Sequence, residues 1–161
     1  MSGACGTCTA CCKLMGVPEL DKPTNKWCDK CHKGSGCAIY DSRPPSCREY
    51  ECVWLQTQDV NGWRMPAELR PDRCHVVLSL TADRDLVTAH VDPGHPNAWR
   101  EGEFFDKIVA LASNGVRVVV SHGQHTTEKK LVERRSSGVV GIRTIKMSEP
   151  DENGTQWADI Q

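Results

Sequence analysis

The sequence lacks long hydrophobic runs and lacks an excess of charge of either sign, and both absences exclude classes of function. No apolar run approaches the roughly 20 residues that a membrane-spanning helix needs, and the longest is Ile108–Ala112. Lys and Arg total 20 against 21 Asp and Glu. Without a basic surface to contact phosphates, nucleic-acid binding is not expected, and neither is a membrane partner.

The common catalytic and nucleotide-binding fingerprints are also missing. The chain contains no GxSxG, HExxH, P-loop or GxGxxG pattern, so its sequence assigns no reaction and leaves open whether it is an enzyme. The segment Met1–Cys5 lacks the basic residues and following apolar stretch of a secretory signal. We therefore expect a cytoplasmic protein.

Cysteine, in contrast, is abundant and concentrated. Of the 10 cysteines, all but Cys74 fall between Cys5 and Cys52. In a reducing cytoplasm, clustered thiols favour metal binding over disulfides. Residues 1–52 also contain few large aliphatic side chains, so this segment buries too little apolar surface to offset its chain entropy. A bound metal would supply the missing folding free energy.

The spacing of these cysteines sharpens the expectation. It divides into Cys5-x2-Cys8-x2-Cys11-Cys12, Cys28-x2-Cys31-x5-Cys37 and Cys47-x4-Cys52. A two-residue gap lets both sulfurs face one ion; tetrahedral Zn²⁺ takes four thiolates at about 2.3 Å, and iron–sulfur clusters use the same ligand type. The predicted metal ligands are Cys5, Cys8, Cys11, Cys12, Cys28, Cys31, Cys37, Cys47 and Cys52. Eight thiolates would make two four-cysteine sites and leave one cysteine over.

Three interpretations of the cluster follow. In the first, the thiolates chelate one or two zinc ions, or iron, and the metal is structural or stored. In the second, they hold a 4Fe-4S cluster with a redox or enzymatic role. In the third, the metal knuckles form a module that binds a protein or a nucleic acid, and here the balanced charge argues against nucleic acid. The sequence identifies no protein partner.

Several motifs around the cysteines resemble a known family. They are Trp27-Cys28, Gly36-Cys37-Ala38-Ile39-Tyr40, Arg43-Pro44, Cys47-Arg48 and Cys52-x-Trp54-Leu55. With the CxxCxxCC start, they resemble the YkgJ-like cysteine cluster family over roughly residues 5–55. The segments Leu20–Pro23, Leu69–Arg73 and Asp92–Arg100 resemble a short bacterial branch of that family. The resemblance implies a zinc- or iron-chelating domain and no particular reaction.

Side chains near the cysteines suggest supporting roles. Arg43 and Arg48 are candidates to balance the negative charge of the thiolates, and Arg43 alternatively pairs with Asp41. Four apolar residues are expected to form a hydrophobic lid over the metal: Trp27, Tyr40, Trp54 and Leu55.

The remainder of the chain contains patterns of strands and of one helix. The β-rich runs His75–Leu80 and Leu86–Val91 predict a hairpin. Apolar residues at helical spacing predict a helix over Ala98–Ser113, ended by Asn114-Gly115. Two later segments, Val116–Ser121 and Val139–Met147, predict further strands. The charged segment Thr126–Arg135 between them predicts a short helix or an excursion.

These elements predict an α+β fold. We expect an irregular, metal-stabilised cysteine-rich N-terminal module at residues 1–55. A small antiparallel sheet with one main helix is expected to form a supporting domain at residues 56–147. Residues 148–161 are acidic and polar and predict a flexible tail.

Most histidines lie in the second half of the chain. His122-x2-His125, together with His90 and Asp92 at another strand end, forms a possible second metal or acid–base site. The segment Asp92–Pro96 is interpreted as a rigid turn leading into the helix. Cys74, outside the cysteine pattern, is interpreted as a structural or incidental thiol.

Overall fold

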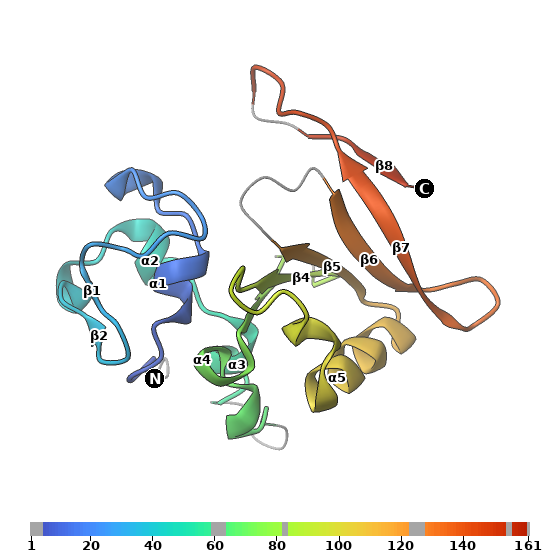
Figure 1. The fold of residues 1–161 in the computed structure, drawn as a ribbon, viewed down its shortest axis with the longest axis horizontal. Coiled ribbons are helices and arrows are strands. Elements are labelled where there is room, and N and C mark those ends of the chain that lie inside the picture. Colours follow the sequence, from blue (N-terminus) through green and yellow to red (C-terminus); the bar gives the residue numbers. More distant parts are fainter. Residues whose placement is uncertain (1–4, 59–63, 82–83, 123–127, 154–155, 161) are drawn as a thin grey trace.

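A six-stranded mixed sheet forms the centre of the computed structural model (Figure 1), which describes residues 5–58, 64–81, 84–122, 128–153 and 156–160. The strands lie side by side in chain order: β3 (Val76–Leu80), β4 (Leu86–Val91), β5 (Arg117–His122), β6 (Glu128–Arg134), β7 (Val140–Met147) and β8 (Ala158–Ile160). Only β4 and β5 run parallel among the neighbouring strands of this sheet in the described ranges.

The parallel pair results from a crossover helix. After β4 the chain makes a 3₁₀ turn, η4 (Ala98–Arg100), and then the helix α5 (Gly102–Ser113), before it returns as β5. Parallel neighbours need such a crossover because a short hairpin turn can only connect antiparallel strands. The prediction of an antiparallel sheet is therefore wrong for the pair β4–β5. The α+β class and the single main helix are confirmed.

The apolar core lies between α5 and one face of the sheet. On β4, Val87, Ala89 and Val91 are buried while the residues between them are not, as the two-residue period of a half-buried strand requires. Opposite them, Ile108 and Ala112 of α5 are fully buried.

The cysteine-rich segment folds into short pieces. They are α1 (Ala10–Leu14), η1 (Pro18–Leu20), β1 (Cys31–His32), β2 (Gly36–Cys37), η2 (Tyr40–Ser42), α2 (Pro45–Glu49) and α3 (Val53–Gln56). Two further turns, η3 (Ala67–Leu69) and α4 (Pro71–Cys74), connect this segment to β3. None of these pieces exceeds five residues, as expected for an irregular module.

The module covers the other face of the first strand. Val77 of β3 is fully buried and forms part of the wall of a cavity in the module. Two residues further along, the hydroxyl of Ser79 shares a hydrogen bond of 2.8 Å with that of Tyr50. Figure 1 shows the module beside this end of the sheet, away from β7 and β8. As a result, β3 is buried on both faces.

Several predicted elements are confirmed. The hairpin forms as β3 and β4, and the two later strands form as β5 and β7. The helix starts at Gly102 instead of Ala98, because Glu101 is extended (φ −103°, ψ 136°) and separates η4 from α5. Gly115 follows the helix with φ +87°, the left-handed conformation that glycine adopts without strain.

The prediction of a short helix or excursion over residues 126–135 is wrong for residues 128–134; residues 126 and 127 lie outside the described residues. Glu128–Arg134 is strand β6, paired antiparallel with both β5 and β7. Its charged residues find cross-strand partners: Glu133 pairs with Arg143, and the Lys130 ammonium donates to Thr144 Oγ1 at 2.7 Å. The sequence of β6 lacks regular alternation, so its strand character depends on these neighbours.

The end of the chain also joins the sheet. Ala158–Ile160 pairs with β7, and the Ser148 N–H donates to the Trp157 carbonyl at 2.8 Å. Within the described ranges, no helix is both long enough and apolar enough to cross a membrane.

Candidate metal centre

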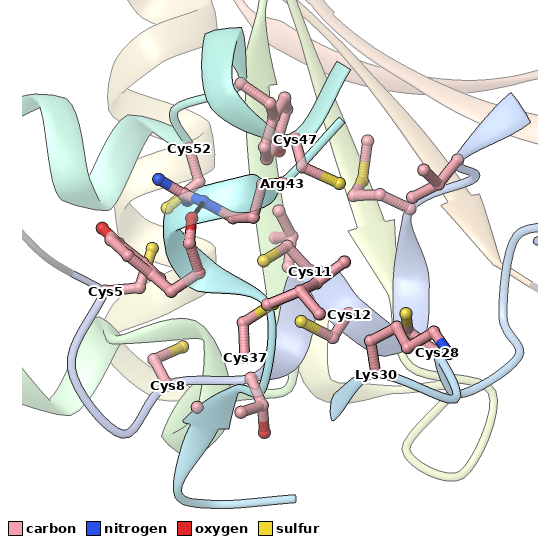
Figure 2. A pocket seen from close by; sticks show the side chains of 18 of the residues that line it. Cys5, Cys8, Cys11, Cys12, Cys28, Lys30, Cys37, Arg43, Cys47 and Cys52 are labelled. Carbon is pink, nitrogen blue, oxygen red and sulfur yellow. Dashed lines mark hydrogen bonds between the residues drawn. The ribbon is translucent and has the colours of Figure 1, made fainter. Parts of the chain in front are cut away.

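A cavity of about 840 Å³ lies within the cysteine-rich module and reaches the buried strand β3. Eight of the nine predicted ligands line it: Cys5, Cys8, Cys11, Cys12, Cys28, Cys37, Cys47 and Cys52. Figure 2 shows their sulfurs directed toward a common space from different turns of the chain. The structure therefore brings together residues that are up to 47 positions apart in the sequence.

Short local hydrogen bonds position the knuckles. In the first, the Cys8 N–H donates to the Cys5 carbonyl at 3.0 Å, and α1 then presents Cys11 and Cys12. In the second, the Cys31 N–H donates to the Cys28 carbonyl at 3.1 Å. The first turn places both Cys5 and Cys8 at the cavity, whereas of the second pair only Cys28 lines it.

Cys31 is the predicted ligand that does not line the cavity. It faces Cys37 across the β1–β2 pair, and the thiols of Cys12 and Cys28 lie close enough to influence its pKa. Burial and the nearby thiols of Cys12 and Cys28 raise the pKa of Cys31 to about 12. Cys31 therefore remains in the thiol cluster, behind the wall of the cavity.

The thiols divide into two neighbourhoods. Cys52 interacts with Cys8 and Cys5 at one side of the cavity. At the other side, Cys47 interacts with Cys12, Cys28 and Cys37. Figure 2 shows Cys5, Cys8 and Cys52 on one side of the view and Cys28 and Cys47 on the other, with Cys11, Cys12 and Cys37 between these positions.

Burial raises the pKa of several thiols in the cluster, among them Cys5, Cys8 and Cys47, and so favours their protonated form. It raises the pKa of Cys52 to about 11, with a further contribution from the Cys8 and Cys5 thiols. The pKa of Cys12 is also raised, by a hydrogen bond with Cys11 and by burial. A metal ion that binds these sulfurs would displace their protons, so its affinity would increase with pH.

A buried lysine lies beside the thiols. Lys22 is only 7% exposed, and its ammonium donates to the carbonyls of Met15 and of Pro23, the latter at 3.1 Å. Burial lowers the pKa of Lys22, and nearby thiols, Cys28 foremost, oppose that shift. Sequence analysis gave Lys22 no role at the metal. Only its unusual depth distinguishes it, because lysine is rarely buried without a partner.

Of the two arginines predicted to balance the thiolates, only Arg43 lines the cavity. Its guanidinium lies 3.7 Å from the centre of the Tyr40 ring, and its Nε donates to the Tyr40 carbonyl at 2.8 Å. Its charge acts on Cys5, opposing the rise in the pKa of that thiol that burial causes. Among the described residues, no ion pair joins Arg43 to Asp41, and Arg48 is exposed.

Three of the four predicted lid residues line the cavity, namely Tyr40, Trp54 and Leu55. Leu55 is buried, and the Trp54 indole N–H donates to the Pro66 carbonyl at 3.0 Å. Trp27 does not belong to this lid. Its ring instead lies 5.0 Å from the Lys33 ammonium.

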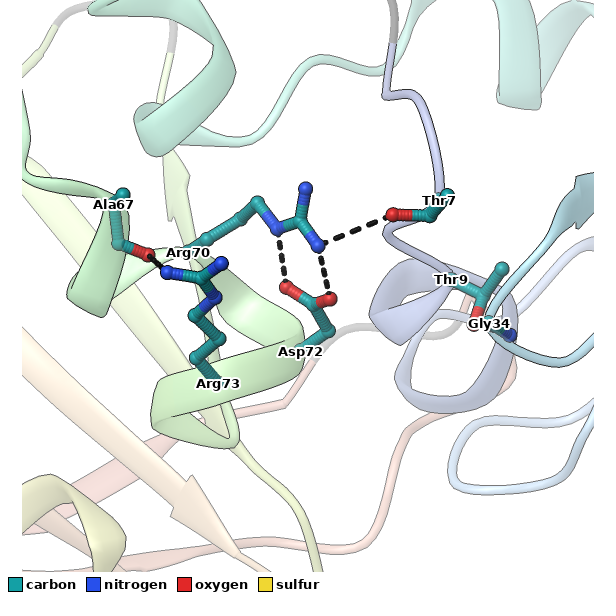
Figure 3. A network of polar contacts seen from close by, with 7 residues as sticks. All are labelled: Thr7, Thr9, Gly34, Ala67, Arg70, Asp72 and Arg73. Atoms are coloured by element: carbon teal, nitrogen blue, oxygen red, sulfur yellow. Dashed lines mark hydrogen bonds and ion pairs between the residues drawn. The ribbon is translucent and has the colours of Figure 1, made fainter.

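A second polar network fixes the module to α4 (Figure 3). The Arg70 guanidinium forms two hydrogen bonds of 2.6 Å with the Asp72 carboxylate and a third, of 3.2 Å, with Thr7. The first knuckle is thereby joined to the turn that precedes β3.

Cys74 lies apart from the cluster. Its thiol donates to the carbonyls of Leu69 and Val76, each at 3.4 Å. Burial raises its pKa to about 11.

The thiols are spaced more widely than the ligands of one tetrahedral ion. Four sulfurs at about 2.3 Å from one zinc ion lie about 3.8 Å from each other. Among the described residues, which include all the cysteines, no three sulfurs lie within 4.8 Å of one another. One mononuclear site would therefore require the module to contract, whereas a larger metal group would require less movement.

The residues that gather around Asp92 differ from those predicted for a second metal or acid–base site. Asp92 lies with His75 and His95, and their ligand atoms are all within 4.8 Å of one another. His90 does not belong to this group. The side chain of His122 and the whole of His125 lie outside the described residues, so their predicted role is not examined by the structure. Sequence analysis missed His75 because nothing in its local pattern places it near Asp92.

Comparison with known proteins gives no family assignment. No family model, no curated protein and no solved structure matches the chain. The functional argument therefore depends on the residues of this chain.

Proposed function

We propose that this chain is a cytoplasmic metal-binding protein that chelates zinc, or iron, through the clustered thiolates of residues 5–52. The metal is structural or stored. One observation carries the proposal: eight cysteines from separate turns line a single cavity. The resemblance of the same residues to the YkgJ-like family points to the same activity.

The chemistry of the surroundings supports this choice. All ten cysteines are free thiols, the form from which thiolate ligands of a metal derive. Several thiolates around one metal group leave net negative charge, and Lys22 and Arg43 are placed to balance part of it. The module itself contributes few fully buried apolar side chains, so a metal would supply the cohesion that its short helices lack.

A second candidate is an iron–sulfur cluster with a redox role, and the spacing of the thiols favours it. The cubane of a 4Fe-4S cluster is bound by four cysteines around a group larger than one ion. The wide separation of the sulfurs and the volume of the cavity are compatible with such a group. Whether the metal group is a zinc or iron ion or an iron–sulfur cluster, the two groups of thiols would offer ligands for two such groups.

The test is the metal content and colour of the full chain purified without oxygen. Stoichiometric zinc in a colourless sample would support the first candidate. Stoichiometric iron and acid-labile sulfide in a brown sample would support the second. A sample that binds neither metal after reconstitution, with all its thiols still reactive, would contradict both.

Variants identify the ligands. Cys37→Ser removes a thiol of the cavity, and Cys74→Ala removes one outside it, so the second is the matched control. We expect metal content to fall in Cys37→Ser and to remain unchanged in Cys74→Ala. Equal metal content in the two variants would exclude Cys37 as a ligand.

A further inference from the structure

Away from the thiol cavity, two histidines and an aspartate converge. We propose that His75, Asp92 and His95 form a separate site for a divalent transition-metal ion such as Zn²⁺. Their nitrogen and carboxylate oxygen atoms all lie within 4.8 Å of one another. The proposal does not depend on the function proposed for the cysteines, because it shares no ligand with them.

The backbone holds the three residues together. The Asp92 N–H donates to the His75 carbonyl at 2.9 Å, and the His95 N–H donates to the Asp92 carbonyl at 2.8 Å. Within the turn, the Gly94 N–H donates to Asp92 Oδ1 at 2.8 Å. His75 itself ends α4 with φ +60°, a left-handed conformation that few residues other than glycine adopt. The cluster therefore results from fixed backbone geometry and not only from flexible side chains.

The donor set has the chemistry of a transition-metal site. Imidazole nitrogen suits zinc, iron, nickel and copper, and two histidines with one carboxylate bind such ions with coordination positions left open. His75 and His95, but not Asp92, also line a cavity of about 390 Å³. Its other charged lining residues are Glu68, Arg73, Glu101 and Glu103. Open positions on an ion would thus face a space with further acidic groups.

One ring has to turn for both imidazoles to bind. The two rings are stacked, with centroids 3.6 Å apart and planes 4° from parallel. Because the nitrogen lone pairs lie in the ring planes, one ion cannot lie in both planes at once. His95 is exposed and belongs to a turn, so its ring is free to rotate while His75, which is half-buried, stays in place.

Lys13 links this site to the thiol module. Its ammonium donates to both oxygens of Asp92, at 2.6 and 2.7 Å, and it follows Cys12 directly in α1. A carboxylate has about four lone-pair positions, so it can accept these bonds and still bind an ion. The positive charge of Lys13 nevertheless opposes a cation at Asp92, and its removal should strengthen metal binding.

Titration of the full chain with Co²⁺ tests the proposal. The chain is used with the metal that it carries as purified, and the imidazole resonances of its histidines are followed by NMR. We expect saturation at one ion per chain, with the largest paramagnetic shifts and line broadening at the ligand imidazoles of His75 and His95 and smaller, through-space shifts at His90. Thiolate-to-cobalt charge-transfer absorption would separately report any binding at the cysteines, so failure of one site is distinguishable from failure of the other.

Three variants complete the test. His95→Ala and Asp92→Asn should weaken Co²⁺ binding by about tenfold or more, while His90→Gln, which removes an imidazole outside the cluster, should match the original chain. The exposed position of His95 makes its substitution safe for the fold, which an unchanged backbone amide spectrum would verify. Co²⁺ affinity equal to that of the original chain in both His95→Ala and Asp92→Asn would overturn the proposal.

The variant Lys13→Met tests whether the Asp92 carboxylate binds the ion. We expect tighter Co²⁺ binding in this variant, because the competing ammonium is lost. Unchanged or weaker binding would exclude Asp92 as a ligand and overturn the three-residue site.

Discussion

The cysteine-rich module and the sheet with α5 use opposite means of cohesion. Residues such as Ile108, Val118 and Val120 of the second region are fully buried in a continuous apolar core. In the module, the cysteines are all half-buried, and the pieces of helix are too short to be stable alone. The comparison teaches that apolar burial accounts for the cohesion of one region of this chain. Under the proposed function, the other region depends on the metal that its thiols would bind.

The strongest way to break this comparison is to remove a metal ligand. We expect Cys37→Ser or Cys8→Ser to unfold the module, because bound zinc contributes about 10–16 kcal/mol to the folding of small zinc domains. Amide hydrogen exchange should show lost protection over residues 5–52 and retained protection in β4 and β5. Native-like protection of the module in both variants, with metal content unchanged, would mean that these thiols are not ligands.

A substitution in the apolar core should destabilise the sheet region and leave metal binding by the module unchanged. Ile108→Ala removes a fully buried side chain of α5 and is expected to lower the free energy of unfolding of the sheet region by about 2–5 kcal/mol. Ile142→Ala, at a position that is 38% exposed, is the control and should change it by less than about 0.5 kcal/mol. Urea unfolding measures both. Equal metal content in the two variants would show that the regions are energetically separate.

Low pH should destabilise the sheet region through His90. Burial, with a contribution from Lys129, lowers the pKa of His90 from 6.5 to about 4 in the folded chain. Below pH 6.5 the unfolded chain takes up a proton that the folded chain does not. The stability of the sheet region is therefore complete above pH 6.5 and falls by up to about 3 kcal/mol as the pH approaches 4.

The variant His90→Gln isolates this effect from other titrations. As the pH falls, the original chain should lose stability that His90→Gln does not lose. Any excess in the unfolding free energy of the original chain over the variant should therefore shrink or change sign. A difference independent of pH between 7 and 4.5 would show that His90 titrates normally in the folded chain.

The smallest expected effect concerns the buried cation of the module. Lys22→Met leaves the carbonyls of Met15 and Pro23 without their donor, which should cost about 1–3 kcal/mol. The same change removes positive charge near the thiols and should weaken metal binding. Lys26→Met, at an exposed position, is the matched control. A competition assay with a chelator would show no difference between the two variants if Lys22 has no part in metal binding.

Regular patterns in the sequence predicted much of the second region. The hairpin β3–β4 and the helix α5 followed from periodicity, because each buries one face and their sequences repeat accordingly. Strand β6 did not, because its charged residues are satisfied by partners on β7 that are distant in sequence. The parallel pairing of β4 with β5 was likewise invisible locally.

By itself, the sequence determined the chemistry of this protein: nine thiols at knuckle spacing and an α+β pattern beside them. Only the tertiary structure decided which groups meet. Lys22 lies near the thiols, and His75 lies against Asp92 and His95, because the chain turns back through contacts between residues far apart. The spacing of residues within a segment shows which ligands that segment offers. Whether side chains from distant segments meet depends on packing and hydrogen bonds across the whole fold. For that reason the cysteine cluster was predictable and the second cluster was not.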